Sequence, residues 1–152
     1  MGKELLTIRV FGASLLPPPA RRPRAVIQVC RRVLANEKLK AGGELNVVFL
    51  VRRRMRVLNK RFLGHDRDTD VIAFAYADDP GPAKGERPFG DIFISVCQAR
   101  AQAAQQAHPV LTEVLFLAAH GTLHLMGYDD STARRRAVML RKQERALPKS
   151  PS

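Results

Sequence analysis

The chain has 152 residues, a length typical of a single domain, and is long enough to bury a core without disulfide staples. Its formal net charge of +12, from 26 Lys and Arg against 14 Asp and Glu, favours a polyanionic partner such as nucleic acid. Nothing resembles a secretory signal or a membrane span, so we expect a cytoplasmic protein with no membrane partner. Cys30 and Cys97, each among apolar residues, are then expected to be reduced core thiols.

Alternating apolar and polar residues predict the strands, and apolar residues at helical spacing predict the helices. Proline, glycine and polar clusters predict the connecting loops. Four strands are expected, at Glu4–Phe11, Glu44–Val51, Val71–Tyr76 and Gly90–Val96. Five helices are expected, at Arg24–Glu37, Arg53–Phe62, Cys97–Ala107, Val110–Met126 and Thr132–Leu147. Loops are expected at Leu15–Pro23, Gly64–Asp70 and Asp79–Pro88, with a disordered tail at Pro148–Ser152.

This order of elements predicts an α/β (α+β) fold in one domain that covers residues 1–152. The sheet should be small, four-stranded and mostly parallel, and it should pack on helices. Val114–Ala119 is a continuous apolar run, and Leu123 and Leu125 extend it. Because a helix that is apolar on nearly all sides is a buried one, Val110–Met126 is the expected central helix.

The segment His120–Asp130 has the residue types and the spacing of a metal site. His120 and His124 are four residues apart, so on a helix they lie on the same face, one turn apart. Gly127 follows where a residue with positive φ can end the helix and turn the chain back, which brings Asp130 toward the two imidazoles. Two nitrogens and one oxygen leave one coordination position open, as catalytic zinc sites do.

Two plainer interpretations of the same residues stay open. A histidine pair at this spacing is often accidental or a satisfied pair on a helix face. Asp130 could instead cap the next helix, because Ser131 and Thr132 lie just before a run of helix-forming residues. The metal interpretation is favoured by the apolar helix, in which two buried imidazoles need polar partners.

Arginine clusters are spread along the chain and are suited to bidentate phosphate binding. The densest cluster precedes and opens the second predicted helix, and we regard it as a candidate RNA-binding segment: Arg52, Arg53, Arg54 and Arg56. For any single cluster, a solvated helix face is the alternative. There is no Trp and there are few aromatic residues, so base-stacking platforms are not evident.

Several blocks in the right order resemble the YbeY family of bacterial endoribonucleases, described as rRNA maturation factors. The family string His-Gly-x-Leu-His-Leu-x-Gly-x-x-His corresponds to His120–Asp130, and further blocks correspond to Leu58–Asn59, Thr69–Phe74 and Gly90–Ser95. The resemblance implies an α/β sandwich whose metal helix is similar to that of metzincin proteases. It also implies a zinc-dependent endonuclease for single-stranded RNA, active in small-subunit rRNA processing and ribosome quality control. Family members are linked to a small-subunit ribosomal protein and to an rRNA-binding GTPase.

The chain departs from the family pattern at two positions. The third family ligand is usually His, whereas Asp130 is a carboxylate, which lowers the charge of the site and should make its metal a weaker Lewis acid. The family arginine of a Leu-Asn-x-x-[Tyr/Phe]-Arg segment falls on Leu63. Arg61 and His65 are candidates for supplying the missing positive charge or a proton; the alternative is that they are a surface helix residue and a loop residue.

Two rival functions compete with RNA cleavage. A metalloprotease would carry Glu directly after the first histidine as general base, but that place is Gly121. A non-catalytic ribosome-assembly or RNA-binding factor, whose metal only stabilises the fold, is the second rival. The predicted cofactor is one zinc ion bound by His120, His124 and Asp130, although such a donor set also accepts nickel, cobalt or iron.

Overall fold

The computed structural model describes residues 6–39, 42–76 and 89–149. Four strands form one sheet with the order β1-β2-β4-β3. The strands are β1 (Thr7–Phe11), β2 (Glu44–Leu50), β3 (Val71–Ala75) and β4 (Gly90–Ser95). β1 pairs parallel with β2 and β2 with β4, while the edge strand β3 runs antiparallel to β4. The small, mostly parallel four-stranded sheet is therefore confirmed.

Five α-helices accompany the sheet, as the sequence predicts. They are α1 (Pro23–Asn36), α2 (Arg52–Leu63), α3 (Val96–Gln106), α4 (Val110–Leu125) and α5 (Ala133–Ala146). The Pro-rich segment before α1 is not a plain loop, because it holds two single-turn 3-10 helices, η1 (Ala13–Leu15) and η2 (Pro18–Ala20). Proline sets the φ angle that such turns require, so η2 begins on two prolines.

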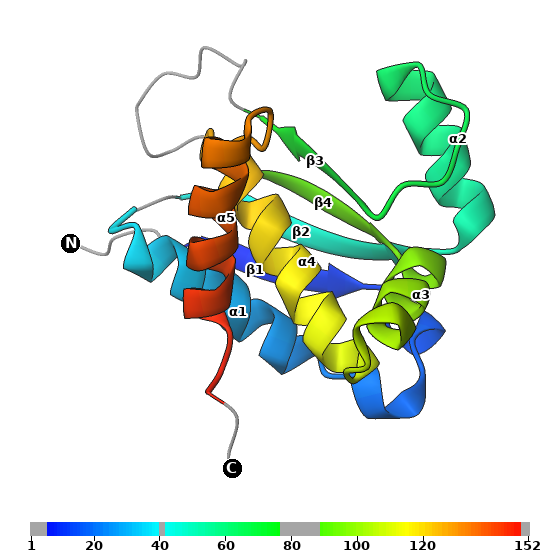
Figure 1. Ribbon diagram of the computed structural model, residues 1–152, viewed down its shortest axis with the longest axis horizontal. Helices are drawn as coiled ribbons and strands as arrows, with labels where there is room; N and C mark the ends of the chain where they lie inside the picture. The colour runs from blue at the N-terminus through cyan, green and yellow to red at the C-terminus, as the bar shows by residue number, and fades with distance from the viewer. Residues whose placement is uncertain (1–5, 40–41, 77–88, 150–152) are drawn as a thin grey trace.

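The two faces of the sheet are covered differently. In β2, Leu45, Val47 and Phe49 are buried and alternate with partly exposed residues, as expected for side chains that point to opposite faces. The buried set faces the layer that holds α1 and α4, which lie in front of the sheet together with α5, whereas α2 lies apart from them (Figure 1). The sequence-predicted core helix α4 is confirmed: it packs against α1, α3, α5 and the strands β3 and β4.

Some sequence-based expectations differ from the structure or lie outside the described residues. Cys97 is exposed on α3, so the prediction of a core thiol is wrong there, since an apolar sequence neighbourhood does not fix the side of the helix. Cys30 is buried in α1, and burial raises the pKa of its thiol to about 11. The expected loop Asp79–Pro88 and the end of the expected tail, residues 150–152, lie outside the described residues. Among the described helices, none combines the length and the apolar character needed to cross a membrane.

Candidate metal centre

Helix α4 carries both histidines near its C-terminal end. The helix forms here because leucine and alanine favour it, and its burial lets packing rather than propensity stabilise it. Within the helix, Thr122 donates its hydroxyl hydrogen to the carbonyl of Ala118 (2.8 Å), so the polar group between the histidines is satisfied internally. His120 and His124 remain on the half-buried side of the helix, where their rings are available to a ligand.

The chain turns back directly after α4, as the glycine predicts. Gly127 has φ +101°, a value that glycine adopts without strain. Its N–H donates to the carbonyl of His124 (3.0 Å), and the N–H of Tyr128 donates to the carbonyl of Leu123 (3.1 Å). These bonds satisfy the last carbonyls of α4 and direct the chain toward Asp130.

The three predicted ligands converge. The Nε2 atoms of His120 and His124 lie 3.0 Å apart, and Nε2 of His120 lies 3.6 Å from Oδ2 of Asp130. One donor atom from each residue falls within 4.8 Å of the others. Two ligands bound to a tetrahedral zinc ion at about 2.1 Å are about 3.4 Å apart, so the residues fit a metal of this size. The alternative role of Asp130 as a helix cap is wrong, because Thr132 caps α5 by accepting from the N–H of Arg135.

Side chains from two neighbouring helices hold the segment that turns back after α4, residues 126–130, in place. We call it the returning segment. Glu37, at the end of α1, accepts hydrogen bonds from the hydroxyl of Tyr128 and from Lys142 of α5 (2.7 Å for the lysine). Lys142 also lies 5.2 Å from the centre of the Tyr128 ring. Arg136 of α5 donates to the backbone carbonyl of Asp130 (3.2 Å). The position of Asp130 is therefore set by packing against α1 and α5 as well as by the turn at the end of α4.

The protonation of His124 suits metal binding. Burial lowers its pKa, and the neighbouring imidazole of His120 lowers it further. The carboxylate of Asp130, a backbone hydrogen bond at Tyr128 and the charge of Asp129 oppose this shift without cancelling it. His124 is therefore a neutral imidazole near pH 7, and a metal ligand must be unprotonated.

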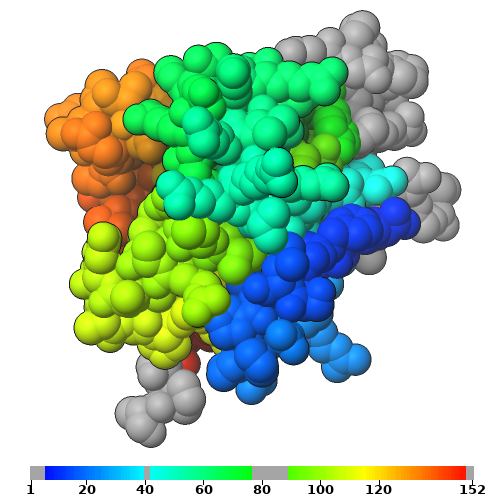
Figure 2. Space-filling view, turned by 90° about the vertical axis from the view of Figure 1, so that its right-hand side faces the viewer, coloured from blue at the N-terminus to red at the C-terminus, as the bar shows by residue number. Residues whose placement is uncertain are grey.

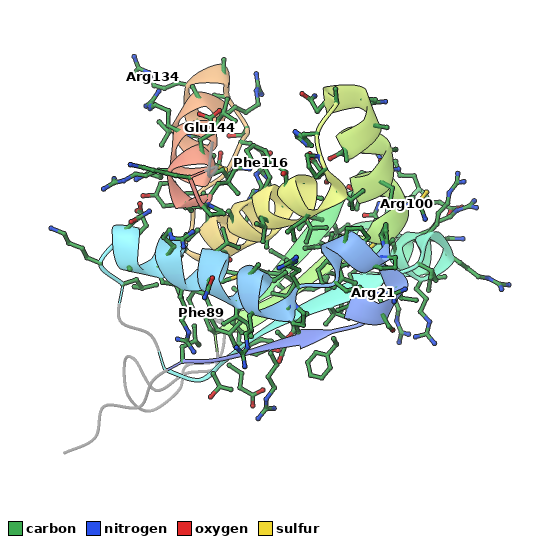
Figure 3. The ribbon with its side chains drawn as sticks, turned by 90° about the horizontal axis from the view of Figure 1, so that it is seen from below. Arg21, Phe89, Arg100, Phe116, Arg134 and Glu144 are labelled. Atoms are coloured by element: carbon green, nitrogen blue, oxygen red, sulfur yellow. The ribbon has the colours of Figure 1, made fainter. Side chains whose placement is uncertain are left out.

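A cleft of about 340 Å³ opens beside the metal ligands. Its walls come from α3, α4 and α5, and its lining includes His120, Asp130, Gln102 and Arg136. Phe116, labelled in Figure 3, lies on α4 and lines the same cleft. A polymer chain that enters this cleft would therefore meet candidate metal ligands and one guanidinium group.

The position after the first histidine is packed tightly against the sheet. A β-carbon added at Gly121 would lie 2.6 Å from Cγ2 of Ile92 on β4, a distance that real β-carbons do not show. The glutamate of a zincin protease could be placed here only if Ile92 moved. The structure thus adds a steric reason to the chemical one for rejecting the protease function.

The arginine cluster of α2 lies on the other face of the sheet. Val48 and Phe93 are paired neighbours that point away from the α4 layer, and with α2 they line a groove of about 660 Å³. Arg53, Arg54 and Arg61 line the same groove. Figure 2 looks onto this side of the molecule, with α2 in teal above β1 in blue. Two of the predicted RNA-binding arginines and the candidate Arg61 thus come together, but away from the metal ligands.

Two further candidates have different surroundings. Arg56 donates to Asp66 (2.8 Å), so its charge is partly used within the protein. His65 is exposed in the loop after α2, and its backbone N–H donates to the carbonyl of Asn59 (3.4 Å). Among the described residues, neither His65 nor Leu63 lines the cleft of the metal ligands.

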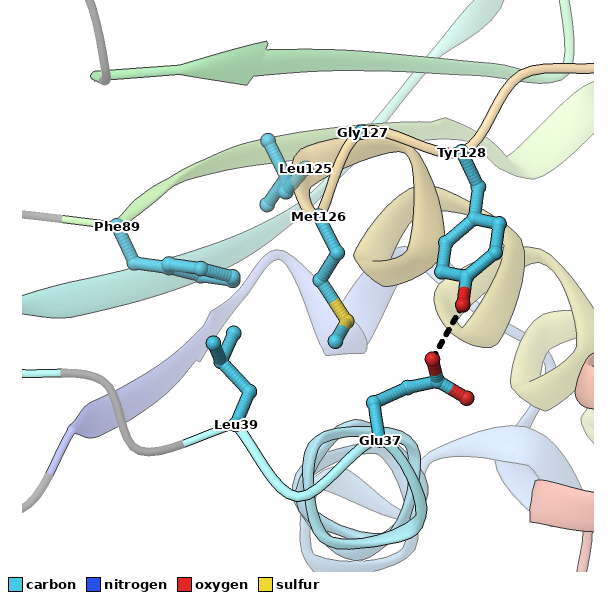
Figure 4. A pocket seen from close by; sticks show the side chains of 7 residues that line it. All are labelled: Glu37, Leu39, Phe89, Leu125, Met126, Gly127 and Tyr128. Atoms are coloured by element: carbon cyan, nitrogen blue, oxygen red, sulfur yellow. Dashed lines mark hydrogen bonds between the residues drawn. The ribbon is translucent and has the colours of Figure 1, made fainter.

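Another cavity lies at the end of α4, beside the turn. It has about 460 Å³ and is lined mainly by apolar side chains, among them Leu39, Phe89 and Met126 (Figure 4). The hydrogen bond between Tyr128 and Glu37 closes one side of it (Figure 4). This cavity has no charged group other than Glu37 in its described lining, and that group is already paired.

The fold and the site together define a class of protein: an α/β domain with a candidate two-histidine, one-carboxylate metal site in a cleft, on a chain whose charge suits a polyanionic substrate. The family model of Endoribonuclease YbeY matches residues 19–150, and the chain belongs to this family. An Endoribonuclease YbeY from Geobacillus thermodenitrificans is 39% identical over 129 residues, which cover 79% of this chain and 81% of the relative.

A second relative supports this assignment, and a solved structure has a similar fold. An Endoribonuclease YbeY from Elusimicrobium minutum is 37% identical over 139 residues, which cover 88% of this chain and 92% of the relative. The solution structure of TM1509 from Thermotoga maritima has a TM-score of 0.57 at 24% identity and covers 93% of this chain and 86% of that one. This likeness concerns the fold alone.

Proposed function

We propose that this protein is a zinc-dependent endoribonuclease that cuts single-stranded RNA during small-subunit rRNA maturation and ribosome quality control. The observation that carries the proposal is the convergence of His120, His124 and Asp130 at a cleft in a chain of net charge +12. The family name and the curated relatives support RNA cleavage. They do not favour the rival function of a non-catalytic assembly factor.

Residues at the cleft would bind the metal and one phosphate of the RNA. His120, His124 and Asp130 hold the metal, and when bound the ion supplies an acidified water and stabilises charge on a phosphoryl oxygen. His124 enters as a neutral imidazole because burial lowers its pKa. Arg136, which lines the cleft, binds a phosphate next to the scissile one. The nucleophile is water or a 2′-hydroxyl of the RNA, and the chemical form of the product ends distinguishes the two.

The α2 segment would bind the RNA outside the cleft. Arg53, Arg54 and Arg61 line one groove, and with Arg52 and Arg56 they supply a run of guanidinium groups suited to flanking phosphates. Arg61 and His65 remain the proposed substitutes for the family arginine. Among the described residues, neither of them lines the cleft of the metal ligands. They could take part in catalysis only if a bound RNA reached from that cleft to the α2 side of the sheet. Alanine variants that cut RNA at the normal rate would end this part of the proposal.

The expected partners follow from the same family membership. We propose the small ribosomal subunit as the site of action, with a ribosomal protein of that subunit and an rRNA-binding GTPase as protein partners in the cytoplasm. Co-purification of the tagged protein with small-subunit particles is the measurement for this part. Absence of the protein from those particles under conditions that preserve them would contradict it.

Cleavage of an end-labelled rRNA fragment tests the main proposal. We expect the zinc-loaded protein to cut the single strand, to leave the same sequence intact when it is paired in a duplex, and to lose activity in chelator. An Asp130→Ala variant should remain folded and lose activity. Intact single-stranded RNA together with a melting temperature that falls on metal removal would instead favour the non-catalytic assembly factor.

A further inference from the structure

Gln143 of α5 is in direct contact with one of the candidate metal ligands. Its Oε1 atom lies 3.1 Å from Nδ1 of His120, the ring nitrogen that faces away from the metal position. Gln143 is buried, with 3% of its surface exposed, and it lies one turn after the buried Met139 on the inner face of α5. A buried amide without partners would be costly, so its hydrogen bonds determine its orientation.

The second contact of Gln143 fixes which way round the amide lies. Its Nε2 atom is 3.3 Å from the backbone carbonyl of Phe116. A carbonyl can only accept a hydrogen bond, so the NH₂ group must face Phe116 and the amide oxygen must face His120. An amide oxygen can only accept, and Nδ1 of His120 must therefore carry the hydrogen. In the neutral ring, the lone pair then sits on Nε2, which points toward His124 and Asp130.

The two histidines are held by different kinds of partner. The backbone of Tyr128 is the polar group that supports His124 from outside the ligand cluster, and no side-chain substitution removes it. The partner of His120 is a side chain. The ring orientation and the tautomer of His120 therefore depend on the residue at position 143.

We propose that Gln143 is a positioning residue that selects the Nδ1–H tautomer of His120 and turns its Nε2 toward the metal. This inference rests on the proposed metal site. Groups that hold the outer nitrogen of a ligating histidine set its tautomer and orientation, and their loss typically weakens metal binding about 10- to 100-fold. A purely structural role, as a tie between α5 and the carbonyl of Phe116, is the competing explanation.

Two substitutions separate these roles. Gln143→Met removes both hydrogen bonds at similar volume, whereas Gln143→Glu keeps an acceptor for His120 and removes the donor to Phe116. We expect zinc affinity, measured by competition with a chromophoric chelator, to fall about 10- to 100-fold in Q143M and to recover in Q143E. Q102M is the matched control, because Gln102 lines the same cleft but donates to Asp70 (3.1 Å) rather than to a metal ligand.

A measurement on the metal-free wild-type protein tests the inference without any variant. ¹⁵N NMR of the histidine rings at a pH where both are neutral should report His120 with its hydrogen on Nδ1. Hydrogen on Nε2, or equal zinc affinities of Q143M, Q143E and the wild type, would overturn the role of Gln143. Neither result depends on RNA cleavage, so failure of the proposed nuclease function would appear separately.

Discussion

Gly121 of α4 packs directly against Ile92 of β4, because a β-carbon at position 121 would lie 2.6 Å from Cγ2 and 3.2 Å from Cδ1 of Ile92. The metal helix therefore approaches the sheet more closely than any residue with a side chain allows. His120 is the preceding residue on the helix, so the distance between α4 and the sheet at Gly121 also sets the position of the His120 side chain. The glycine of the sequence motif is thus a packing requirement of the site.

Gly121→Ala should destabilise the protein, although alanine is the better helix former. Alanine gains about 1 kcal/mol of helix propensity, but overpacking a core contact costs about 1 to 3 kcal/mol. We expect a net loss in the free energy of unfolding, measured with urea, together with weaker zinc binding as His120 shifts.

The double-mutant cycle with Ile92→Ala is the control for this prediction. Ile92→Ala removes the atoms that the new methyl group would meet, and the cavity it leaves costs about 2 to 5 kcal/mol. Gly121→Ala should therefore cost less in the Ile92→Ala background than in the wild type. Equal costs in the two backgrounds would show that the packing of Gly121 on Ile92 is not the cause.

Removal of Asp130 should abolish the stabilisation that zinc confers. A ligand that binds only the folded state adds about 2.7 kcal/mol at about 100 times its dissociation constant. We expect zinc to raise the melting temperature of the wild type and not that of Asp130→Ala. Asp129→Ala is the matched control, because Asp129 pairs with Arg135 (2.9 Å) and lies outside the ligand cluster. An equal zinc shift in Asp130→Ala would exclude this carboxylate as a ligand.

Glu37 should make the returning segment sensitive to acid. Burial raises the pKa of Glu37, but the hydrogen bonds from Lys142 and Tyr128 outweigh it, so the pKa lies below its ordinary value of 4.5. A lowered pKa means that the stabilisation is complete above the unfolded-state pKa and is lost as the pH falls through the folded-state pKa.

Glu37→Gln should therefore be less stable than the wild type at pH 7, by about 1 kcal/mol for a partly screened charged hydrogen bond. The difference should begin to shrink as the pH falls below the ordinary pKa of 4.5 and should vanish once the pH is below the lowered pKa of folded Glu37, as urea titrations at several pH values would show. Glu144→Gln is the matched control, because it removes the same charge from an exposed glutamate on α5, labelled in Figure 3. A difference that persists unchanged in acid would argue against the ion pair with Lys142.

The groove under α2 should contribute to RNA affinity through charge. We expect Arg53→Ser with Arg54→Ser to weaken binding of long single-stranded RNA. In a plot of the logarithm of the RNA-binding constant against the logarithm of the salt concentration, the slope should become shallower by about 0.7 for each phosphate that the protein no longer neutralises. Arg22→Ser with Arg24→Ser removes the same charge from another exposed segment. Equal losses of RNA affinity in the two double variants would show that net charge alone explains the effect. That result would contradict a specific role of the groove.

The sequence predicts those features that depend on spacing within one element. His120 and His124 converge because helical geometry places residues four apart on one face, and Gly127 takes the positive φ that its residue type suggests. The mostly parallel sheet follows from the alternation of strands and helices. Even the third predicted ligand, Asp130, lies within reach because the turn after α4 is short.

Features that depend on how elements pack against each other could not be predicted. Gln143 lies 23 residues from His120, and only the register of α5 against α4 brings the two together. The pairing of Glu37 with Tyr128 joins α1 to the segment after α4 for the same reason. The exposure of Cys97 is equally hidden from the sequence, because α3 is weakly amphipathic and its buried side is fixed by tertiary contacts.

One metal ion held by His120, His124 and Asp130 is the feature on which the proposed RNA cleavage depends. The most direct measurement is a zinc titration of metal-free protein, with the cleavage rate of a single-stranded rRNA fragment recorded at each addition. We expect the wild-type rate to rise from zero and to level off at one equivalent of zinc, while a folded His124→Ala variant stays inactive. Full activity in the metal-free protein, or an equal rate in His124→Ala, would contradict this dependence.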